Sequence, residues 1–295
     1  MGFLNRLKNG WKLFTQSLVT FFNKPILLAP FIVSWMITAG IILGTRYYMP
    51  ARLSFLTAFV LLFLIALTIS VSSLVMLEFI QQIESGKRIS VRKALKQLFT
   101  RNLLKALPIV LIWTVIWFII LLLQSSKEEK GDPEPSMEDA ARTLGGADSG
   151  LFSWLDLGLD MLEKLVRMTV FLSLPGIAWE DKGPINSIKT AMNVIREHTL
   201  QFLSAYTLTG LFSLLMAIPL VVIFTMAQNT IFSAFFWSLV ILYEMFIWSF
   251  GMYIEQMSVG ILYLWHLKWK EAGSTGNLSD VPRPELTDQV HEFER

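Results

Sequence analysis

The sequence predicts an all-α protein: a polytopic membrane helix bundle with about six spanning helices plus three amphipathic helices on its cytoplasmic side. The composition supports this class, because 54% of the residues are hydrophobic and only 16% are charged, whereas about 25% of an average soluble domain is charged. The apolar residues also gather in long blocks, and a spanning helix needs roughly 20 of them in succession. A third observation, the uneven distribution of Lys and Arg between the blocks, predicts the orientation.

The apolar blocks divide the chain into its predicted elements. Six blocks are long enough to span a membrane, at 26–48, 55–80, 106–124, 151–179, 200–227 and 231–265. We expect residues 1–271 to form a single integral membrane domain and residues 272–295 to form a flexible cytoplasmic tail. The connection at 125–150 carries seven acidic and three basic residues. It has little to bury, which is typical of a mobile segment, and it is predicted to be an external loop.

Basic residues predict which ends of the spans face the cytoplasm. With the N-terminus inside, 18 of the 25 Lys and Arg residues lie in cytoplasmic segments and five lie in external loops. The remaining two, Lys164 and Arg167, lie within the fourth block. Because cytoplasmic loops are enriched in Lys and Arg, we expect both termini in the cytoplasm of a multi-pass cell-membrane protein.

Three amphipathic stretches precede spanning blocks. Apolar residues recur at helical spacing within 4–21, 91–98 and 185–195, and basic residues lie opposite them. Such helices lie in the headgroup layer, with the apolar face in the membrane and the basic face toward anionic lipid. The residues predicted to contact lipid headgroups are Lys8, Lys12, Arg92, Lys93, Lys96, Lys189 and Arg196.

Two of these stretches are related in sequence. At an offset of 97, the hexapeptide from Ser90 to Leu95 aligns with the hexapeptide from Ser187 to Met192. This similarity predicts a parallel repeat in which each unit is a span, a surface helix and another span. The alternative is a chance similarity between two basic amphipathic helices.

The fourth block carries charges along one helical face. Asp156, Asp160, Glu163 and Arg167 share that face, and Lys164 lies beside it. A lone charge at mid-membrane costs on the order of 3 kcal/mol or more, so these groups need partners or water. Two interpretations stay open: a helix that neutralises itself through i,i+4 pairs and extends above the membrane, or a polar cavity open to the outside.

The sixth block contains two acids, Glu244 and Glu255, on one face with Gly251. A helix of roughly 35 residues would be about 52 Å long, so it must tilt, break near Gly251 or continue into the cytoplasm, where Glu255 would lie at the interface. Glu244, near mid-depth, is either a proton or cation site or one half of a structural ion pair. Counting the helical rise from the predicted outer end of each block places Glu244 and Arg167 at similar depths in the membrane. This predicts that Arg167 is the partner of Glu244.

Enzyme motifs are missing from the sequence. It contains no GxSxG, HExxH, Walker A or GxGxxG pattern and no cysteine. The three histidines, His198, His266 and His291, are widely separated and do not match a metal-binding spacing. We therefore expect no catalytic, cofactor-binding or metal-binding residues. A net charge of +2 also predicts no attraction to nucleic acid.

One segment supports a resemblance to known families. The stretch PGIAWEDKGP at 175–184, followed by the helix-forming INSIKTA, resembles uncharacterised prokaryotic families of six-helix membrane proteins. These are similar in layout to the membrane domain attached to some glycerophosphoryl diester phosphodiesterases. The resemblance implies a six-helix membrane domain, in a prokaryotic cytoplasmic membrane, without an established activity. The soluble phosphodiesterase domain has no counterpart in these 295 residues, so that catalysis is not expected.

These observations predict a non-enzymatic integral membrane protein that supports a membrane or envelope process, as a scaffold or assembly partner. Its expected partner is a bilayer with anionic headgroups, and a protein partner stays open. The alternative is a transporter or channel for a small solute, ion or lipid that uses the intramembrane charges. A cavity lined by Glu244 and the charges of the fourth block favours transport, whereas a dry bundle with paired charges favours a scaffold.

Overall fold

A computed structural model describes residues 3–48, 54–84, 87–128, 154–227, 233–273 and Val281. All regular elements within these residues are helices. The helices of the predicted spans are α2 (Ala29–Tyr48), α3 (Phe55–Glu84), α5 (Leu103–Glu128), α7 (Trp154–Ala178), α9 (Thr199–Ala227) and α10 (Ala234–Glu271). Each begins and ends within several residues of a predicted apolar block, because a long apolar run buries itself only as a helix in lipid.

Among the described residues, five helices are long and apolar enough to cross a membrane: α2, α3, α5, α9 and α10. The predicted membrane helix bundle is therefore confirmed. The fourth predicted span, α7, does not reach the same apolarity, since it carries Glu163, Lys164 and Arg167 in its middle. It nevertheless packs against α3, α5, α8 and α10, so it lies within the bundle.

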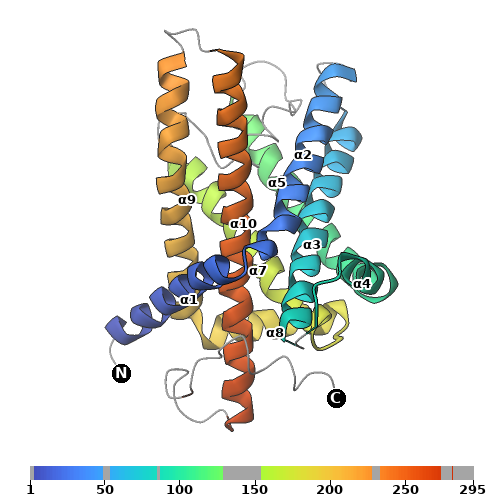
Figure 1. Ribbon diagram of the computed structural model, residues 1–295, viewed down its shortest axis with the longest axis vertical. Helices are drawn as coiled ribbons and strands as arrows, with labels where there is room; N and C mark the ends of the chain where they lie inside the picture. Colours follow the sequence, from blue (N-terminus) through green and yellow to red (C-terminus); the bar gives the residue numbers. More distant parts are fainter. Residues whose placement is uncertain are drawn as a thin grey trace.

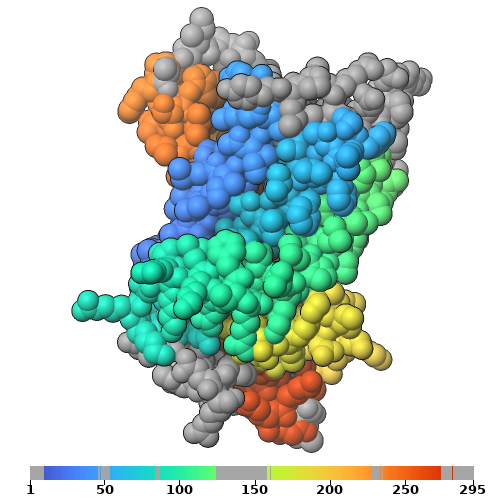
Figure 2. Space-filling model, turned by 90° about the vertical axis from the view of Figure 1, so that its right-hand side faces the viewer, coloured from blue at the N-terminus to red at the C-terminus, as the bar shows by residue number. Residues whose placement is uncertain are grey.

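The three amphipathic stretches form helices that do not run along the spans. They are α1 (Phe3–Asn23), α4 (Val91–Gln97) and α8 (Pro184–Glu197), and α4 continues into a short π-helical segment, Leu98–Asn102. In Figure 1, α8 runs across the lower ends of the spans, α4 turns away from the direction of α3, and α1 crosses α10 obliquely. Figure 2 shows α4 as a ledge below α2 and α3, with α8 and the end of α10 beneath it. Helices that lie across the spans are expected if these stretches occupy a headgroup layer, and their position in a membrane stays a prediction.

Local capping explains where two of these helices begin. Ser90 precedes α4, and its hydroxyl accepts a hydrogen bond from the backbone N–H of Lys93 at 3.3 Å, as an N-cap residue does. The backbone N–H of Ser90 in turn donates to the Gln82 side chain at 2.6 Å, which ties α4 to the end of α3. Pro184 occupies the first turn of α8, where its missing N–H costs nothing.

The two related stretches, α4 and α8, share a burial pattern as well as a sequence pattern. Ala94 and Ala191, which correspond at the offset of 97, are both buried against the bundle, whereas Leu95 and Met192 are both exposed. Each helix also joins two predicted spans, α3 with α5 and α7 with α9. The helices differ at their starts, because Ser90 caps α4 whereas Ser187 lies inside α8. The repeat stays a prediction that these correspondences support.

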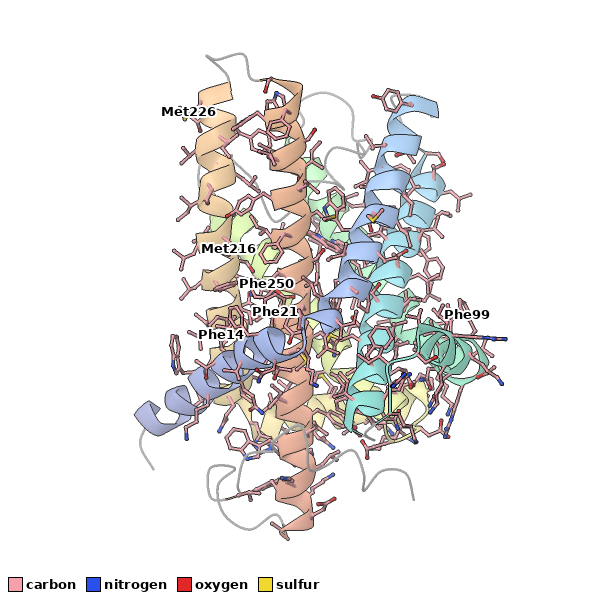
Figure 3. The ribbon with its side chains drawn as sticks, viewed as in Figure 1. Phe14, Phe21, Phe99, Met216, Met226 and Phe250 are labelled. Atoms are coloured by element: carbon pink, nitrogen blue, oxygen red, sulfur yellow. The ribbon has the colours of Figure 1, made fainter. Side chains whose placement is uncertain are left out.

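The buried face of α1 is shifted from the predicted apolar stripe, of which Phe14 is buried and Leu18 and Phe21 pack against the core. The sequence places Trp11 in the apolar stripe, but its side chain is 54% exposed, whereas Leu13 and Ser17 are fully buried. The reason is that α1 packs on protein, against α9 and α10. At this crossing the ring of Phe14 lies 5.5 Å from Phe212, and Phe21 lies 4.7 Å from Phe250 (Figure 3).

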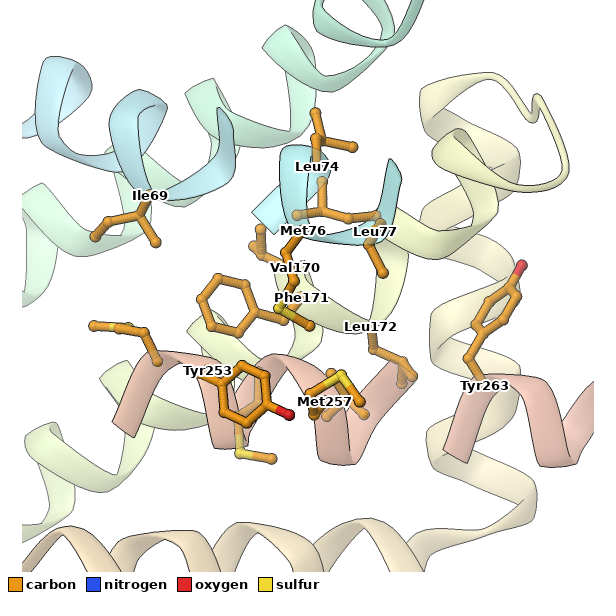
Figure 4. Close-up of a cluster of buried hydrophobic side chains, with 14 of the residues drawn as sticks. Ile69, Leu74, Met76, Leu77, Val170, Phe171, Leu172, Tyr253, Met257 and Tyr263 are labelled. Carbon is orange, nitrogen blue, oxygen red and sulfur yellow. The ribbon is translucent and has the colours of Figure 1, made fainter. Parts of the chain in front are cut away.

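The core of the lower bundle lies between α3, α7 and α10. Figure 4 shows side chains from these three helices, among them Met76, Phe171 and Tyr253, meeting in one cluster. All three side chains are fully buried. This packing holds α7 beside α10 and thereby sets which of their polar residues meet.

Helix α10 is a single unbroken helix of 38 residues, so it does not break near Gly251. Its length of about 57 Å exceeds the apolar core of a membrane, and its last turns extend beyond the other helices in Figure 1. The predicted external loop lies outside the described residues from 129 onward. The predicted tail lies outside them except for residues 272, 273 and Val281, whose carbonyl accepts a hydrogen bond from the Trp265 indole at 3.2 Å.

Candidate functional site

Four of the five residues predicted to form an intramembrane polar site come together between α7 and α10. They are Glu163, Lys164 and Arg167 from α7 and Glu255 from α10. Their side chains are 4% to 14% exposed, so the cluster lies inside the bundle. The fifth predicted residue, Glu244, is not part of it.

Arg167 is the centre of the cluster. Its Nε and Nη2 atoms donate to the two carboxylate oxygens of Glu255 at 2.9 and 3.2 Å, which is a bidentate pair across two helices. Its Nη1 atom donates to Glu163, one turn earlier on α7, at 3.2 Å. The guanidinium therefore bridges two carboxylates and fixes α7 against α10.

Lys164 completes the charge balance. Its Nζ atom lies 3.5 Å from Glu255 Oε1 and 5.0 Å from the ring centroid of Tyr206 on α9. Gly210 gives the ammonium group room, since a Cβ at that position would lie 2.9 Å from Nζ. With Lys164 the cluster holds two acids and two bases, so it is neutral as a whole. Buried ions are tolerated only with this kind of mutual pairing.

This arrangement bears on the two interpretations of the charges in the fourth block. The predicted i,i+4 pair of Glu163 with Arg167 is present, but the stronger contact of Arg167 is with α10 rather than within its own helix. The side chains of Asp156 and Asp160 lie outside the described part of the chain. The charges that are described are paired with one another across α7 and α10.

The predicted pair of Arg167 with Glu244 is wrong. Glu244 is exposed on the surface of α10, and Arg167 instead binds Glu255, which is 3% exposed and therefore lies inside the bundle. The error lies in the register of the two helices. Figure 1 shows the upper ends of α9 and α10 well above the start of α7, and Glu255 lies three turns, or about 16 Å, below Glu244 along α10.

The residues predicted to contact lipid headgroups lie on α1, α4 and α8, which we call the transverse helices because they run across the spans. The side chain of Lys8 lies outside the described part of the structure. Among the others, Lys12 is exposed on α1, and the remaining five are exposed on α4 and α8, namely Arg92, Lys93, Lys96, Lys189 and Arg196. The geometry leaves these five pointing away from the bundle. Their predicted contact with anionic lipid stays a prediction.

Sequence reasoning missed a polar contact where α3 meets the π-helical segment. Asn102 donates to the carboxylate of Glu78 at 2.9 Å, and both side chains are 1% exposed. One signal was available, because Glu78 is an acid near the C-terminal end of an otherwise apolar block. The π-helical turn, which aims Asn102 inward, has no such signature in the sequence.

A second missed contact involves the turn at 180–183. Asp181 has a positive φ of 57°, and its carboxylate accepts hydrogen bonds from Arg101 in the π-helical segment and from Lys105 at the start of α5. These hydrogen bonds lower the pKa of Asp181 from 3.8 to about 2. The turn at 180–183 thus fixes the connection between α7 and α8 to the π-helical segment and the start of α5.

The histidines were also misjudged. His198 and His266 are 68 residues apart in sequence, yet His198 Nε2 lies 3.1 Å from His266 Nδ1. Glu197 Oε2 lies 3.4 Å from the same nitrogen of His266. The prediction that the histidines lie far apart is therefore wrong for this pair, because the end of α8 packs beside the lower part of α10.

The comparisons with known proteins assign no family. No family model, no curated protein and no solved structure matches this chain. The resemblance to prokaryotic six-helix membrane families therefore stays a prediction that rests on the residues of 175–191 alone.

Proposed function

We propose that this chain is a non-enzymatic, multi-pass membrane protein that supports a membrane or envelope process as a scaffold or assembly partner. The observation that carries the proposal is the closed charge cluster of Glu163, Lys164, Arg167 and Glu255, in which each group contacts an opposite charge. A transport site must exchange its contacts with a passing ion or solute. This cluster instead uses its contacts to join α7 and α10.

The transverse helices α4 and α8 supply the surface through which the proposed scaffold contacts lipid headgroups and a protein partner. Helices α4 and α8 expose basic residues beside exposed apolar ones, such as Lys189 beside Met192. Each Lys or Arg near an anionic membrane surface adds about 1 kcal/mol of attraction. Such helices hold one end of the bundle at the headgroup layer and present their polar side to the cytoplasm.

In-cell photocross-linking tests the scaffold directly. A photoreactive residue at Asn193, on the exposed polar side of α8, is expected to give a discrete protein adduct. The matched control is Leu214 on α9, whose side chain is 65% exposed and which faces lipid in a bundle of this kind. Adducts from Leu214 alone, or from neither position, contradict the proposed surface.

One observation favours transport as a second candidate function. Glu244 lies on the apolar part of α10, is exposed, and has no hydrogen-bond or ion-pair partner among the described residues. A carboxylate in that position suits reversible binding of a proton or cation. Glu255, the other acid in the apolar part of α10, belongs to the closed cluster, whereas Glu244 does not.

Proteoliposome flux separates the two functions. The purified protein is reconstituted with a proton-sensitive dye inside the vesicles and a lipid reporter in the membrane. We expect wild type and Glu244→Gln to give the same background signal. If the wild type gives flux and Glu244→Gln abolishes it without unfolding the protein, the protein is a transporter and the scaffold proposal is wrong.

A further inference from the structure

The end of α8 and the lower part of α10 bring three metal-ligating side chains together. Glu197 ends α8, His198 follows it as the C-cap, and His266 projects from α10. The side chains of both histidines are buried, whereas the side chain of Glu197 is 39% exposed. The ring of Trp269 lies 5.2 Å from His198 and 5.9 Å from His266 and walls one side of the group.

We propose that Glu197, His198 and His266 bind one divalent transition-metal ion, and that Zn²⁺ is the ion this group fits best. The proposal adds to the proposed function and does not depend on it. It concerns residues outside the charge cluster between α7 and α10.

The distances between the three groups suit a single ion. His198 Nε2 and His266 Nδ1 are 3.1 Å apart, and His266 Nδ1 and Glu197 Oε2 are 3.4 Å apart. Bonds from Zn²⁺ to nitrogen or oxygen are about 2.0–2.2 Å long, so tetrahedral ligands stand roughly 3.3 Å from one another. All three ligand atoms lie within 4.8 Å of one another, and the exposed carboxylate is free to close the remaining gap.

The chemistry of the donors narrows the choice of ion. Two imidazoles and one carboxylate suit borderline ions such as Zn²⁺ and leave a fourth position for water. The chain contains no cysteine, so it offers no thiolate to select softer ions. Three protein ligands with an open fourth position are the arrangement of zinc sites in which the ion can bind water or a further ligand.

Charged side chains near the two histidines act both for and against a bound cation. The carboxylate of Glu197 brings a negative charge to within 3.4 Å of His266 Nδ1. The positive charges of Lys182 and Lys270 act on His266 and oppose a cation. Glu180 lies 2.9 Å from Lys182 and neutralises one of them.

A hydrogen bond between the two rings is the simpler account of their contact. It explains the distance of 3.1 Å, but it does not explain why the Glu197 carboxylate approaches the same nitrogen of His266. Three donors converging on one point are what a coordinated ion requires. A bound ion would fasten the junction of α8 and α9 to α10.

Metal binding by the full-length protein tests the proposal. The protein is purified in detergent through a tag that contains no histidine, stripped with a chelator, and titrated with Zn²⁺ against a fluorescent competitor. We expect one equivalent of Zn²⁺ and a higher Tm when it binds. Co²⁺ should give visible d–d bands of a low-coordinate site.

Matched variants assign the ligands. Glu197→Gln and His198→Gln should weaken Zn²⁺ binding by at least the roughly 10–100-fold that loss of an outer-shell partner already causes. Glu271→Gln is the control and should bind as the wild type does, since Glu271 is described by the structure and does not belong to the group. Glu197 is exposed, so its replacement should keep the fold and remain informative even if a histidine variant does not fold.

Two results overturn the proposal. One is a wild type that holds no more Zn²⁺ than the double variant Glu197→Gln/His198→Gln. The other is equal affinity in the wild type and Glu197→Gln, which leaves only the hydrogen bond between the rings.

Discussion

Removing Arg167 tests whether the charge cluster holds the bundle together. In Arg167→Met the guanidinium that contacts Glu163 and Glu255 at 2.9–3.2 Å is lost. Two buried carboxylates then remain with Lys164 as the only cation of the cluster, so one negative charge is stranded. Breaking a buried pair from one side costs about 3–5 kcal/mol, and we expect a loss of that size in the free energy of unfolding.

A second substitution should recover part of this loss. Arg167→Met with Glu255→Met removes one charge of each sign, and both methionines fill space at an apolar helix contact. Replacing a buried ion pair by apolar residues of similar volume is often neutral or stabilising. Recovery is partial, because Glu163 and Lys164 are adjacent on α7 and do not face each other.

Glu244→Gln is the matched control for the loss of a carboxylate on α10. Its side chain is exposed and lies outside the cluster, so we expect a change within about 0.5 kcal/mol, as for most surface substitutions. This is the reverse of what a pair between Arg167 and Glu244 would give. The control therefore also tests the corrected register of α7 and α10.

The assay is equilibrium unfolding by SDS in mixed micelles, followed by the fluorescence of the ten tryptophans. Wild type, the single variant, the double variant and Glu244→Gln are compared at one protein and detergent concentration. The reasoning is refuted if Arg167→Met unfolds within about 1 kcal/mol of the wild type. It is equally refuted if the double variant is no more stable than the single one.

Three further predictions concern packing, pH and topology. A Cβ at Gly10 would lie 2.0 Å from the Cβ of Ser204, so Gly10→Ala should cost about 1–3 kcal/mol in the SDS assay, and Ser204→Gly should relieve it. The pKa of Asp181 is lowered from 3.8 to about 2, so its stabilisation is present above pH 3.8 and is lost as the pH falls toward 2. Being half-exposed, it contributes below about 1 kcal/mol, and Asp181→Asn should remove this pH dependence of the unfolding midpoint. Single cysteines at 130 and 190 should react with an impermeant thiol reagent from opposite sides of the membrane.

Each of these has a control or a contradicting result. Gly40→Ala should be nearly neutral, because no atom lies within 4 Å of a Cβ at that position. A midpoint that falls with pH equally in wild type and Asp181→Asn would assign the effect to other groups. Labelling of both cysteines from one side would contradict the predicted topology, and the background is clean because the chain has no cysteine of its own.

The positions of the long helices could be predicted from the sequence because hydrophobicity is a local property. Each apolar block buries its own backbone polar groups as a helix, whatever its neighbours are. The first residues of α4 and α8 are also determined by local interactions, since the hydroxyl of Ser90 and the ring of Pro184 act within one turn. The same holds for the pair of Glu163 and Arg167, whose spacing places them on one helical face.

Tertiary structure alone decided which residues meet across helices. Arg167 binds Glu255 and not Glu244 because α10 is shifted along its axis relative to α7, and the pattern of a single helix contains no information on such a shift. His198 and His266 meet for the same reason, since the packing of α8 beside α10 brings together residues 68 positions apart. The buried face of α1 likewise depended on its contact with α9 and α10. Periodicity determines which face of a helix is apolar, whereas the partner of that face depends on the relative position of two helices, which is set by packing across the whole bundle.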